Sequence, residues 1–341
     1  MIILNGLGCT LSGGHLVLQE LIDAFPHDQR LHVIAPKGKN LQKYNSSGNI
    51  SIHYLNHNIW KGVLRLLPEF FINILLYIKL ADLCFNISNY GLCLNKNQVL
   101  YIQNQYMVDL SYNSIGMKIK RIMMNTYLKR AKYICVQTNH MITQLKTYSA
   151  EKNIKIDNAR IKKLSPLPSI PSSLSKSKTE KKYKFEFFYP ASTFIHKHAD
   201  IAIHSMNGKK DIGLSITVDP IDEKSRTNIN YLGVVNHLSV VEEFSKADAL
   251  LFTSSRESLG LPLLEALAFE IPAVLPDMEY AREIYADAAV YYSENTVESV
   301  SVAIDKLVDD YSFYKRLAIQ RKSIEWNTRM TWREHWTEIL G

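Results

Sequence analysis

The chain has 341 residues, of which 46% are hydrophobic, and it carries a formal net charge of +7. This length fits two domains of ordinary size, and the apolar content is too high for a disordered chain. No uncharged apolar run reaches the roughly eighteen residues of a membrane-spanning helix, so none is predicted.

The charge is unevenly distributed along the chain. Residues 1–165 hold 20 Lys and Arg against 8 Asp and Glu, a net +12, whereas residues 166–341 hold 20 against 25, a net −5. A basic half of this kind favours an anionic partner. Nucleic acid and anionic lipid headgroups are both candidates, beside a solvated basic surface with no partner.

The cysteines and the start of the chain indicate the cellular compartment of the protein. Cys9, Cys84, Cys93 and Cys135 are scattered and form no C-x-x-C pair. We therefore expect buried thiols in a reducing compartment, without disulfides or zinc. The chain begins with an apolar strand and not with a basic leader, which favours a cytoplasmic location.

The first half of the chain predicts a doubly wound α/β domain. An apolar strand at 2–4, a glycine-rich loop at 6–14 and a helix at 15–24 are a typical opening for such a domain. The glycines are not spaced as G-x-G-x-x-G and no acid follows near position 35, so the dinucleotide signal is weak. Gly13 and Gly14 instead favour close approach of a ligand to the backbone. The remaining strands are predicted at 30–35, 50–55, 82–86, 99–102 and 133–136, with a helix at 139–148.

Two apolar segments of this half also carry basic residues. Residues 56–81 are the most apolar part of the chain, and Pro68 is expected to kink them. Residues 117–132 predict a basic amphipathic helix. Each segment is either a helix over the core or an amphipathic helix at a bilayer surface. For residues 56–81 the core helix is the preferred interpretation. For residues 117–132 the core helix and the bilayer-surface helix are equally favoured.

The second half predicts another α/β domain. Residues 166–182 are rich in Pro, Ser and Lys and are the predicted linker between an N-terminal domain at 1–165 and a C-terminal domain at 183–310. Residues 311–341 predict a terminal helix that carries Trp326, Trp332 and Trp336 and can cross back to the first domain. In the C-terminal domain, strands are predicted at 185–189, 214–218, 231–234, 249–252, 273–275 and 288–291, and helices at 199–206, 237–246, 280–285 and 297–309.

The segment 249–269 carries the clearest functional signal. A buried strand is followed by a polar loop with Gly260 and by a helix whose first turn contains Pro262. The amides at such a helix start form an anion site, and Glu257 and Glu265 lie beside it. A nucleotide sugar offers a diphosphate to the amides and hydroxyls to the acids. From spacing alone, the two acids can equally well complement the helix dipole and face water.

Residues 230–292 resemble the glycosyltransferase family 4 type of retaining, nucleotide-sugar-dependent enzymes. The matching features are the E-x7-E pair Glu257 and Glu265, the run Arg-Glu-Ser-Leu-Gly-Leu-Pro-Leu-Leu-Glu-Ala around it, Ile-Pro-Ala-Val at 271–274, Asp277 and Glu283. The resemblance implies the GT-B fold, in which two Rossmann-like doubly wound domains face each other across a cleft.

The same resemblance implies roles for individual residues. Glu257 would contact the donor sugar, Lys197 the diphosphate and Glu265 the ribose hydroxyls. Gln103 and Asn104 are acceptor-side candidates, because many members have a histidine there. The resemblance implies neither a metal nor a cofactor, since the nucleotide sugar is a substrate. The other donor-binding candidates are Ser258, Leu259, Gly260, Leu261, Gly13 and Gly14.

The chain also departs from the family. Ser192 stands where members often have an arginine, so Lys197, backbone amides or another cation must offset the leaving-group charge. Ser258 and Glu270 replace usual glycines, and Glu270 is expected to point outward because a buried unpaired charge is costly.

The function implied is retaining transfer of a hexose-type sugar from a UDP- or GDP-linked donor. The acceptor would be a glycan or a polyprenyl-linked glycan of bacterial surface polysaccharide assembly, such as O-antigen, at the inner face of the cytoplasmic membrane. One alternative is a nucleotide-sugar epimerase on the same fold, against which the scarcity of acids in the first half counts. Another is a nucleic-acid-binding protein that uses the basic half, although no binding signature is present. A donor-binding but inactive member is a third.

Overall fold

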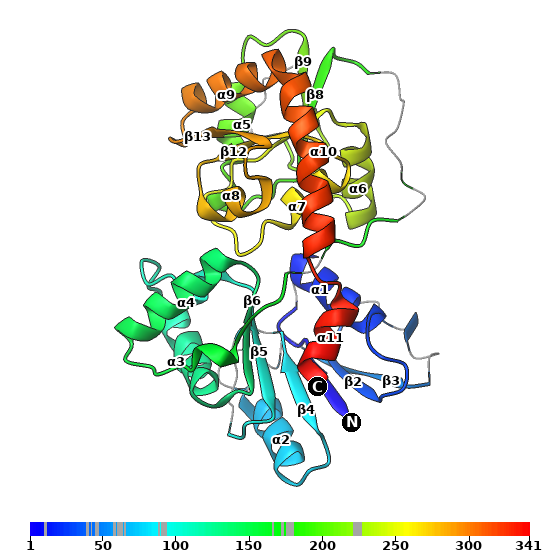
Figure 1. The fold of residues 1–341 in the computed structure, drawn as a ribbon, viewed down its shortest axis with the longest axis vertical. Helices are drawn as coiled ribbons and strands as arrows, with labels where there is room; N and C mark the ends of the chain where they lie inside the picture. Colours follow the sequence, from blue (N-terminus) through cyan, green and yellow to red (C-terminus); the bar gives the residue numbers. More distant parts are fainter. Residues whose placement is uncertain are drawn as a thin grey trace. The chain divides into compact units, whose positions relative to one another are not determined.

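Two α/β units make up the structure, which is a computed structural model (Figure 1). Unit 1 contains Met1–Pro166 and Met330–Gly341, and unit 2 contains Leu167–Arg329. The structure describes residues 1–9, 12–38, 41, 43–44, 48–56, 59, 64, 66–87, 89, 94–165, 167–171, 174, 181–220 and 227–341.

Unit 1 is built on a parallel sheet with the strand order β3-β2-β1-β4-β5-β6-β7. On β1, Ile2 lies opposite Leu31 on one side and Leu83 on the other. Such strands are rich in β-branched and other apolar residues because both faces of a parallel sheet are covered by helices. The strands are β1 (Ile2–Asn5), β2 (Leu31–Pro36), β3 (Ile50–Leu55), β4 (Leu83–Asn86), β5 (Gln98–Ile102), β6 (Tyr133–Val136) and β7 (Ile161–Lys163).

Alternating side chains divide unit 1 into two apolar layers. Leu4 and Tyr101 pack with α1 and α11 on one face, whereas Ile3 packs with α2 and Leu100 packs with α3 and α4 on the other. The period of two follows from the pleat of a strand. The helices are α1 (Ser12–Asp23), α2 (Leu66–Tyr77), α3 (Ile115–Arg130), α4 (Asn139–Glu151) and α11 (Trp332–Leu340).

The C-terminal helix α11 belongs to the core of unit 1. Trp336 is fully buried and its Nε1 donates to the carbonyl oxygen of Leu21 at 2.9 Å. Trp332 Nε1 donates to the buried carboxylate of Glu20 at 3.0 Å. Burying two indoles with both N–H groups satisfied docks the end of the chain against α1 (Figure 1).

Unit 2 is built on a second parallel sheet with the order β10-β9-β8-β11-β12-β13. Its strands are β8 (Phe185–Tyr189), β9 (Ile212–Ile216), β10 (Ile229–Tyr231), β11 (Ala249–Leu251), β12 (Ala273–Pro276) and β13 (Ala289–Tyr292). Its helices are α5 (Ala199–Ser205), α6 (His237–Lys246), α7 (Leu261–Ala268), α8 (Glu279–Tyr285), α9 (Val297–Asp309) and α10 (Tyr311–Thr328).

The strand order of unit 2 positions its functional loops. The chain moves outward from β8 through β9 to β10, and then returns to β11 on the other side of β8. The loops that leave the carboxyl ends of β8 and β11 therefore begin next to each other. In open parallel sheets this switch point is where ligands bind.

Several predicted elements differ from those observed. The predicted terminal helix at 311–341 is wrong as a single element: α10 and α11 are separated at Arg329, and Thr331 caps α11 with a capping box to Glu334. Pro68 does not kink a helix, because α2 begins at Leu66 and proline is tolerated in a first turn. Strand β7 was not predicted at all.

The first part of the apolar segment 56–81 lies largely outside the described residues. Among the residues that the structure does describe, no helix has the length and hydropathy needed to cross a bilayer.

Candidate functional site

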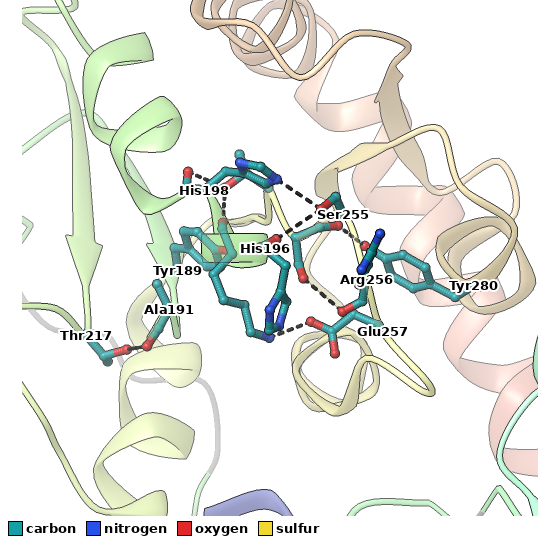
Figure 2. A network of polar contacts seen from close by, with 12 residues as sticks. Tyr189, Ala191, His196, His198, Thr217, Ser255, Arg256, Glu257 and Tyr280 are labelled. Atoms are coloured by element: carbon teal, nitrogen blue, oxygen red, sulfur yellow. Dashed lines mark hydrogen bonds and ion pairs between the residues drawn. The ribbon is translucent and has the colours of Figure 1, made fainter. Parts of the chain in front are cut away.

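The loops after β8 and β11 are joined by hydrogen bonds. The hydroxyl of Thr253 donates to the carbonyl oxygens of Lys197 and His198 at 2.8 and 2.9 Å. The backbone N–H of Ser255 donates to the carbonyl oxygen of His196 at 2.8 Å. Figure 2 shows His196, His198 and Ser255 in this contact. The two segments therefore form one preorganised surface above the adjacent strand ends.

Two further side chains fix the β8 loop. The hydroxyl of Tyr189 donates to the carbonyl oxygen of Lys197 at 2.5 Å, and burial raises the pKa of this phenol, which therefore stays protonated as a donor. His198 adopts the left-handed conformation (φ 46°) and its Nε2 lies 2.9 Å from Ser255 Oγ. This uncommon backbone conformation for a histidine lies at the start of α5.

Lys197 and Glu257 form an ion pair at the centre of this surface. Lys197 Nζ lies 2.5 Å from Glu257 Oε1, and the two side chains are 14% and 15% exposed. The ammonium is also 5.2 Å from the ring centroid of Phe252. A cation and a carboxylate that are both nearly desolvated interact strongly, and either can exchange its partner for a ligand group. The structure thus brings together the two residues that were predicted to be catalytic.

His196 adds a neutral polar group beside this pair. Burial lowers the pKa of its imidazole, and the positive charge of Lys197 lowers it further. At neutral pH the ring is therefore uncharged. It adds no positive charge to a cluster that already contains Lys197 and Arg256.

The β11 loop ends at Gly260, where the backbone is left-handed (φ 72°). A Cβ atom built there would lie 3.3 Å from Leu263, so both the conformation and the space favour glycine. The predicted donor-binding residues Ser258, Leu259 and Gly260 lie in this loop, and Leu261 opens α7. Tyr280 holds the loop in place, because its hydroxyl donates a hydrogen bond to the carbonyl oxygen of Ser254 at 2.5 Å.

Glu265 lies on α7 with its carboxylate buried. Its Oε1 is 2.6 Å from Nε2 of His237, the first residue of α6, whose side chain is 38% exposed. This histidine was not predicted as a site residue. The available signal was its position at the start of a helix that follows a strand, where Asn236 provides the cap.

Two other residues near the strand ends carry polar groups suited to an anionic ligand. The hydroxyl oxygen of Ser192 is buried and makes no hydrogen bond within the described part of the chain. Arg256 directly precedes Glu257 (Figure 2). It is a second cation in the loop, and the arginine that the resemblance implies at position 192 is a serine in this chain.

The remaining predicted residues lie in unit 1. Gly13 and Gly14 belong to the first turn of α1 and not to the preceding loop, and the space around the Gly13 Cα is open. Gln103 follows β5, and its backbone N–H donates to Asn89 Oδ1 at 2.5 Å. Asn104 accepts the backbone N–H of Tyr106 at 2.9 Å, so its side chain caps a short 3-10 turn. In the described residues, no cluster of three or more His, Cys, Asp and Glu is arranged for a metal ion.

Sequence comparison identifies relatives over part of the chain. Residues 222–324 match the model of the family described as glycosyl transferases group 1. The chain is 28% identical to the serotype-specific mannosyltransferase WbdA of Escherichia coli over 124 residues, which are 34% of this chain and 14% of WbdA. It is 26% identical to the O-antigen chain mannosyltransferase RfbU of Salmonella typhimurium over 100 residues, 29% of this chain and 28% of RfbU. It is 34% identical to the O-antigen biosynthesis glycosyltransferase WbnH of Escherichia coli over 95 residues, 27% of this chain and 26% of WbnH. The chain thus spans only a minor part of the length of these relatives.

Structural comparison covers both units. Anabaena Alr3699/HepE, solved with UDP and glucose, matches with a TM-score of 0.72 at 12% identity over 99% of this chain and 98% of HepE. WaaG, a glycosyltransferase involved in lipopolysaccharide biosynthesis, matches with a TM-score of 0.70 at 15% identity over the full length of both chains. The predicted fold class is confirmed: the two parallel-sheet units form the GT-B fold. Neither comparison favours an epimerase or a nucleic-acid-binding protein.

Proposed function

We propose that the protein is a retaining glycosyltransferase that moves a hexose-type sugar from a UDP- or GDP-linked donor to a glycan acceptor. The observation that carries the proposal is the Lys197–Glu257 ion pair above the adjacent carboxyl ends of β8 and β11. Glu257 and Glu265 both lie within the segment that matches the glycosyl transferase family model. Mannose and glucose are the first sugars to test, because two relatives are named mannosyltransferases and HepE was solved with UDP and glucose.

Donor binding would break the Lys197–Glu257 ion pair. The diphosphate carries more charge than one carboxylate, so Lys197 Nζ would turn toward the phosphate oxygens. Glu257 would then be released to accept hydrogen bonds from the sugar hydroxyls. The amides at the start of α7 and Arg256 would add positive potential to the same anion.

Glu265 would bind the ribose through the carboxylate oxygen that faces away from His237. A carboxylate that accepts two hydroxyl donors forms charge-assisted hydrogen bonds, which are about twice as strong as neutral ones. Its burial against α6 holds this acceptor in one position before the ligand arrives.

The chemical step would be positioning and electrostatic stabilisation. As the bond from the anomeric carbon to the diphosphate oxygen breaks, negative charge develops on the leaving group beside Lys197. The acceptor oxygen attacks the same face of an oxocarbenium-like centre, and its proton passes to the departing phosphate oxygen. No metal is required in this scheme, since Lys197, Arg256 and backbone amides supply the positive charge.

We place the acceptor at the inner face of the cytoplasmic membrane, as a polyprenyl-linked glycan. The support is the set of relatives named for O-antigen synthesis and the net +12 of residues 1–165. Gln103 and Asn104 remain the acceptor-side candidates in unit 1, whereas Gly13 and Gly14 in the first turn of α1 remain donor-binding candidates.

The proposal is tested by donor binding and turnover in one panel. The purified full chain is incubated with UDP-, GDP- and ADP-sugars, with EDTA present, and the melting temperature and nucleotide release are measured. We expect one donor to raise the melting temperature and to be turned over. Lys197→Ala should lower turnover about a hundredfold to a thousandfold, the usual cost of losing one donor at a developing oxyanion.

Lys184→Ala is the matched control, since Lys184 also forms an ion pair, with Asp211, but its side chain is 80% exposed. This variant should keep the wild-type turnover. Nuclear magnetic resonance of the product should show the anomeric configuration of the donor. No stabilisation by any sugar nucleotide, or equal turnover of Lys197→Ala and wild type, would sink the proposal.

A further inference from the structure

Helix α2 of unit 1 shows its apolar side to the outside. Its side chains Leu67, Phe71 and Tyr77 are 57%, 61% and 81% exposed. The exposed positions follow one another at intervals of three and four residues and so form a single stripe along the helix. The exposed apolar residues of the stripe are Leu67, Phe70, Phe71, Ile74 and Tyr77.

The buried side of α2 carries the polar residues. Glu69 and Asn73 are buried there together with Ile72 and Leu76. A helix over a core normally has the reverse distribution, with charged residues outward. The core-helix interpretation of this segment is therefore incomplete: α2 packs on the sheet through Ile72 and Leu76, but Leu67, Phe70, Phe71 and Ile74 stay exposed.

A buried hydrogen-bond network fixes this orientation. The carboxylate of Glu69 accepts from Asn5 Nδ2 at 2.9 Å and from the hydroxyl of Tyr127 at 2.8 Å. Asn73 Oδ1 accepts from Gln98 Nε2 at 2.6 Å. A rotation of α2 that buried its phenylalanines would break these hydrogen bonds. Buried polar groups would then lose their partners, which lowers the stability of the unit. The exposed stripe is thus the stable state of the unit.

The apolar surface continues beyond α2. Ile78 and Leu80 in the following turn are exposed. Leu94 is also exposed and is tied to α2, because its backbone N–H donates to Asn73 Oδ1 at 2.9 Å. Helix α3, joined to α2 by the Tyr127–Glu69 bond, exposes three isoleucines. These are Ile115, Ile119 and Ile122. We call residues 66–80, 94–96 and 115–130 the α2–α3 surface.

The exposed charges of the α2–α3 surface are all positive. Its acidic residue, Glu69, is buried, so no exposed acid lies within these residues. Arg130 reaches the part beside α2, since its Nη1 donates to the carbonyl oxygen of Leu94 at 3.3 Å. The exposed basic residues are Lys79, Lys96, Lys118, Lys120, Lys129 and Arg130.

We propose that the α2–α3 surface inserts into an anionic lipid bilayer, with the stripe of α2 among the acyl chains and the lysines at the headgroups. Aromatic and aliphatic side chains flanked by Lys and Arg are the composition of interfacial helices. A second copy of this chain fits less well, because it would bring an equal net positive charge to the contact. A nucleic acid would satisfy the lysines but not the exposed apolar stripe. The inference rests on unit 1 alone and does not depend on the proposed transferase activity.

The test is vesicle co-sedimentation of the full-length protein. Vesicles of phosphatidylcholine are compared with vesicles that also contain phosphatidylglycerol, at low and high salt. We expect binding to the anionic vesicles that weakens with salt. The double variant Phe70→Ser/Phe71→Ser should lower the partition coefficient by more than about tenfold, because two apolar side chains leave the acyl region. Lys118→Ala should lower it about fivefold on anionic vesicles only.

Phe313→Ser is the matched control, because Phe313 is exposed to a similar degree on α10 of unit 2. It should bind vesicles like wild type, and so should Lys197→Ala, which separates this proposal from the proposed function. Circular dichroism and the melting temperature verify that each variant is folded. Equal vesicle binding by wild type and the folded Phe70→Ser/Phe71→Ser variant would overturn the proposal. So would a concentration-dependent dimer that this variant abolishes without any vesicle binding by wild type.

Discussion

Glu69 in unit 1 and Glu265 in unit 2 are both buried on helices that pack on the sheets, and these two glutamates differ in their partners. Glu69 on α2 is 1% exposed, and its partners Asn5 and Tyr127 are themselves buried and uncharged. Glu265 on α7 is 2% exposed, but its partner His237 has a side chain that is 38% exposed. The first carboxylate is enclosed by the fold, whereas the second is connected to solvent through an ionisable group.

This difference indicates which buried charge belongs to a site. Burial alone marks both residues equally, since an isolated buried carboxylate is costly in either place. Buried neutral donors, such as Asn5 and Tyr127, make the carboxylate part of the architecture. A partner that reaches solvent leaves room for a ligand to take one side of the carboxylate. We therefore assign Glu69 to the stability of unit 1, and we expect Glu265 to act in ligand binding.

The largest expected effect is on the stability of unit 1 when Glu69 is replaced. Glu69→Ala leaves the amide of Asn5 and the hydroxyl of Tyr127 without this acceptor, and we expect a loss of about 4 kcal/mol from two bonds to a charged group. The measurement is amide hydrogen exchange of α2. Glu298→Ala on the exposed start of α9 should change little. A loss below about 1 kcal/mol would contradict the structural role.

The next largest effect is a pH dependence of the stability of unit 1. His335 on α11 is buried and makes no hydrogen bond among the described residues, and burial lowers the pKa of its imidazole to about 4. The folded-state pKa is below the unfolded value, so the unfolded chain binds the proton first as pH falls. Stability should therefore decrease from pH 6.5 down to about 4, by about 3 kcal/mol in total.

His335→Leu keeps a buried side chain of similar size and removes the proton site. Its urea midpoint should fall less than that of wild type between pH 7 and pH 5. Parallel curves for the two proteins over this interval would show that the pKa of His335 does not differ between the folded and unfolded states.

A smaller effect is expected on donor affinity at the other glutamate. Glu265→Gln keeps the shape but loses the charge, so the proposed hydrogen bonds to the ribose hydroxyls should weaken by about 2 kcal/mol, or about thirtyfold in Kd. Unit 2 should keep its melting temperature in the absence of nucleotide. Calorimetric titration with the donor found in the panel measures the change. A fall in stability with unchanged affinity would place Glu265 in the same structural class as Glu69.

His237→Ala sharpens this test. If His237 only orients the carboxylate, the variant should raise the donor KM several-fold with little change in kcat, and His237→Asn should restore part of the loss.

The sequence predicted unit 2 better than unit 1, for physical reasons. Helices α6 and α9 were predicted with their observed limits, because Asn236 and Thr296 cap them and their apolar periodicity is regular. Lys197 and Glu257 were predicted as site residues only through a resemblance. Their ion pair was not predicted, because it joins loops sixty residues apart that the strand order places together. His237 was missed because its contact with Glu265 arises from the packing of α6 on α7.

The inverted burial of α2 could not be read from local sequence. Its polar face is matched by Asn5 and Gln98, which come from two strands distant in the chain and are both hydrogen-bonded to Asn86. The break between α10 and α11, by contrast, had a local signal. Thr331 and Glu334 have the capping-box spacing that marks the start of a new helix.

The smallest expected effect is at Glu270, where the resemblance implies a glycine. Its backbone is left-handed (φ 60°) just after α7, a position that favours glycine at the end of a helix. The expectation that its side chain points outward is confirmed, because the carboxylate is partly exposed and lies 3.0 Å from Lys322 Nζ. Glu270→Gly should relieve the backbone strain by about 1 kcal/mol and lose an ion pair worth less than that.

The net result should be a gain of a few tenths of a kcal/mol in the stability of unit 2. Glu270→Ala separates the two contributions, because it loses the ion pair but keeps the Cβ atom in the left-handed conformation. It should therefore melt below wild type while Glu270→Gly melts slightly above it. If both variants melt lower by the same amount, the ion pair with Lys322 and not the backbone determines the stability at this position. The glycine that the resemblance implies would then have no conformational basis in this chain.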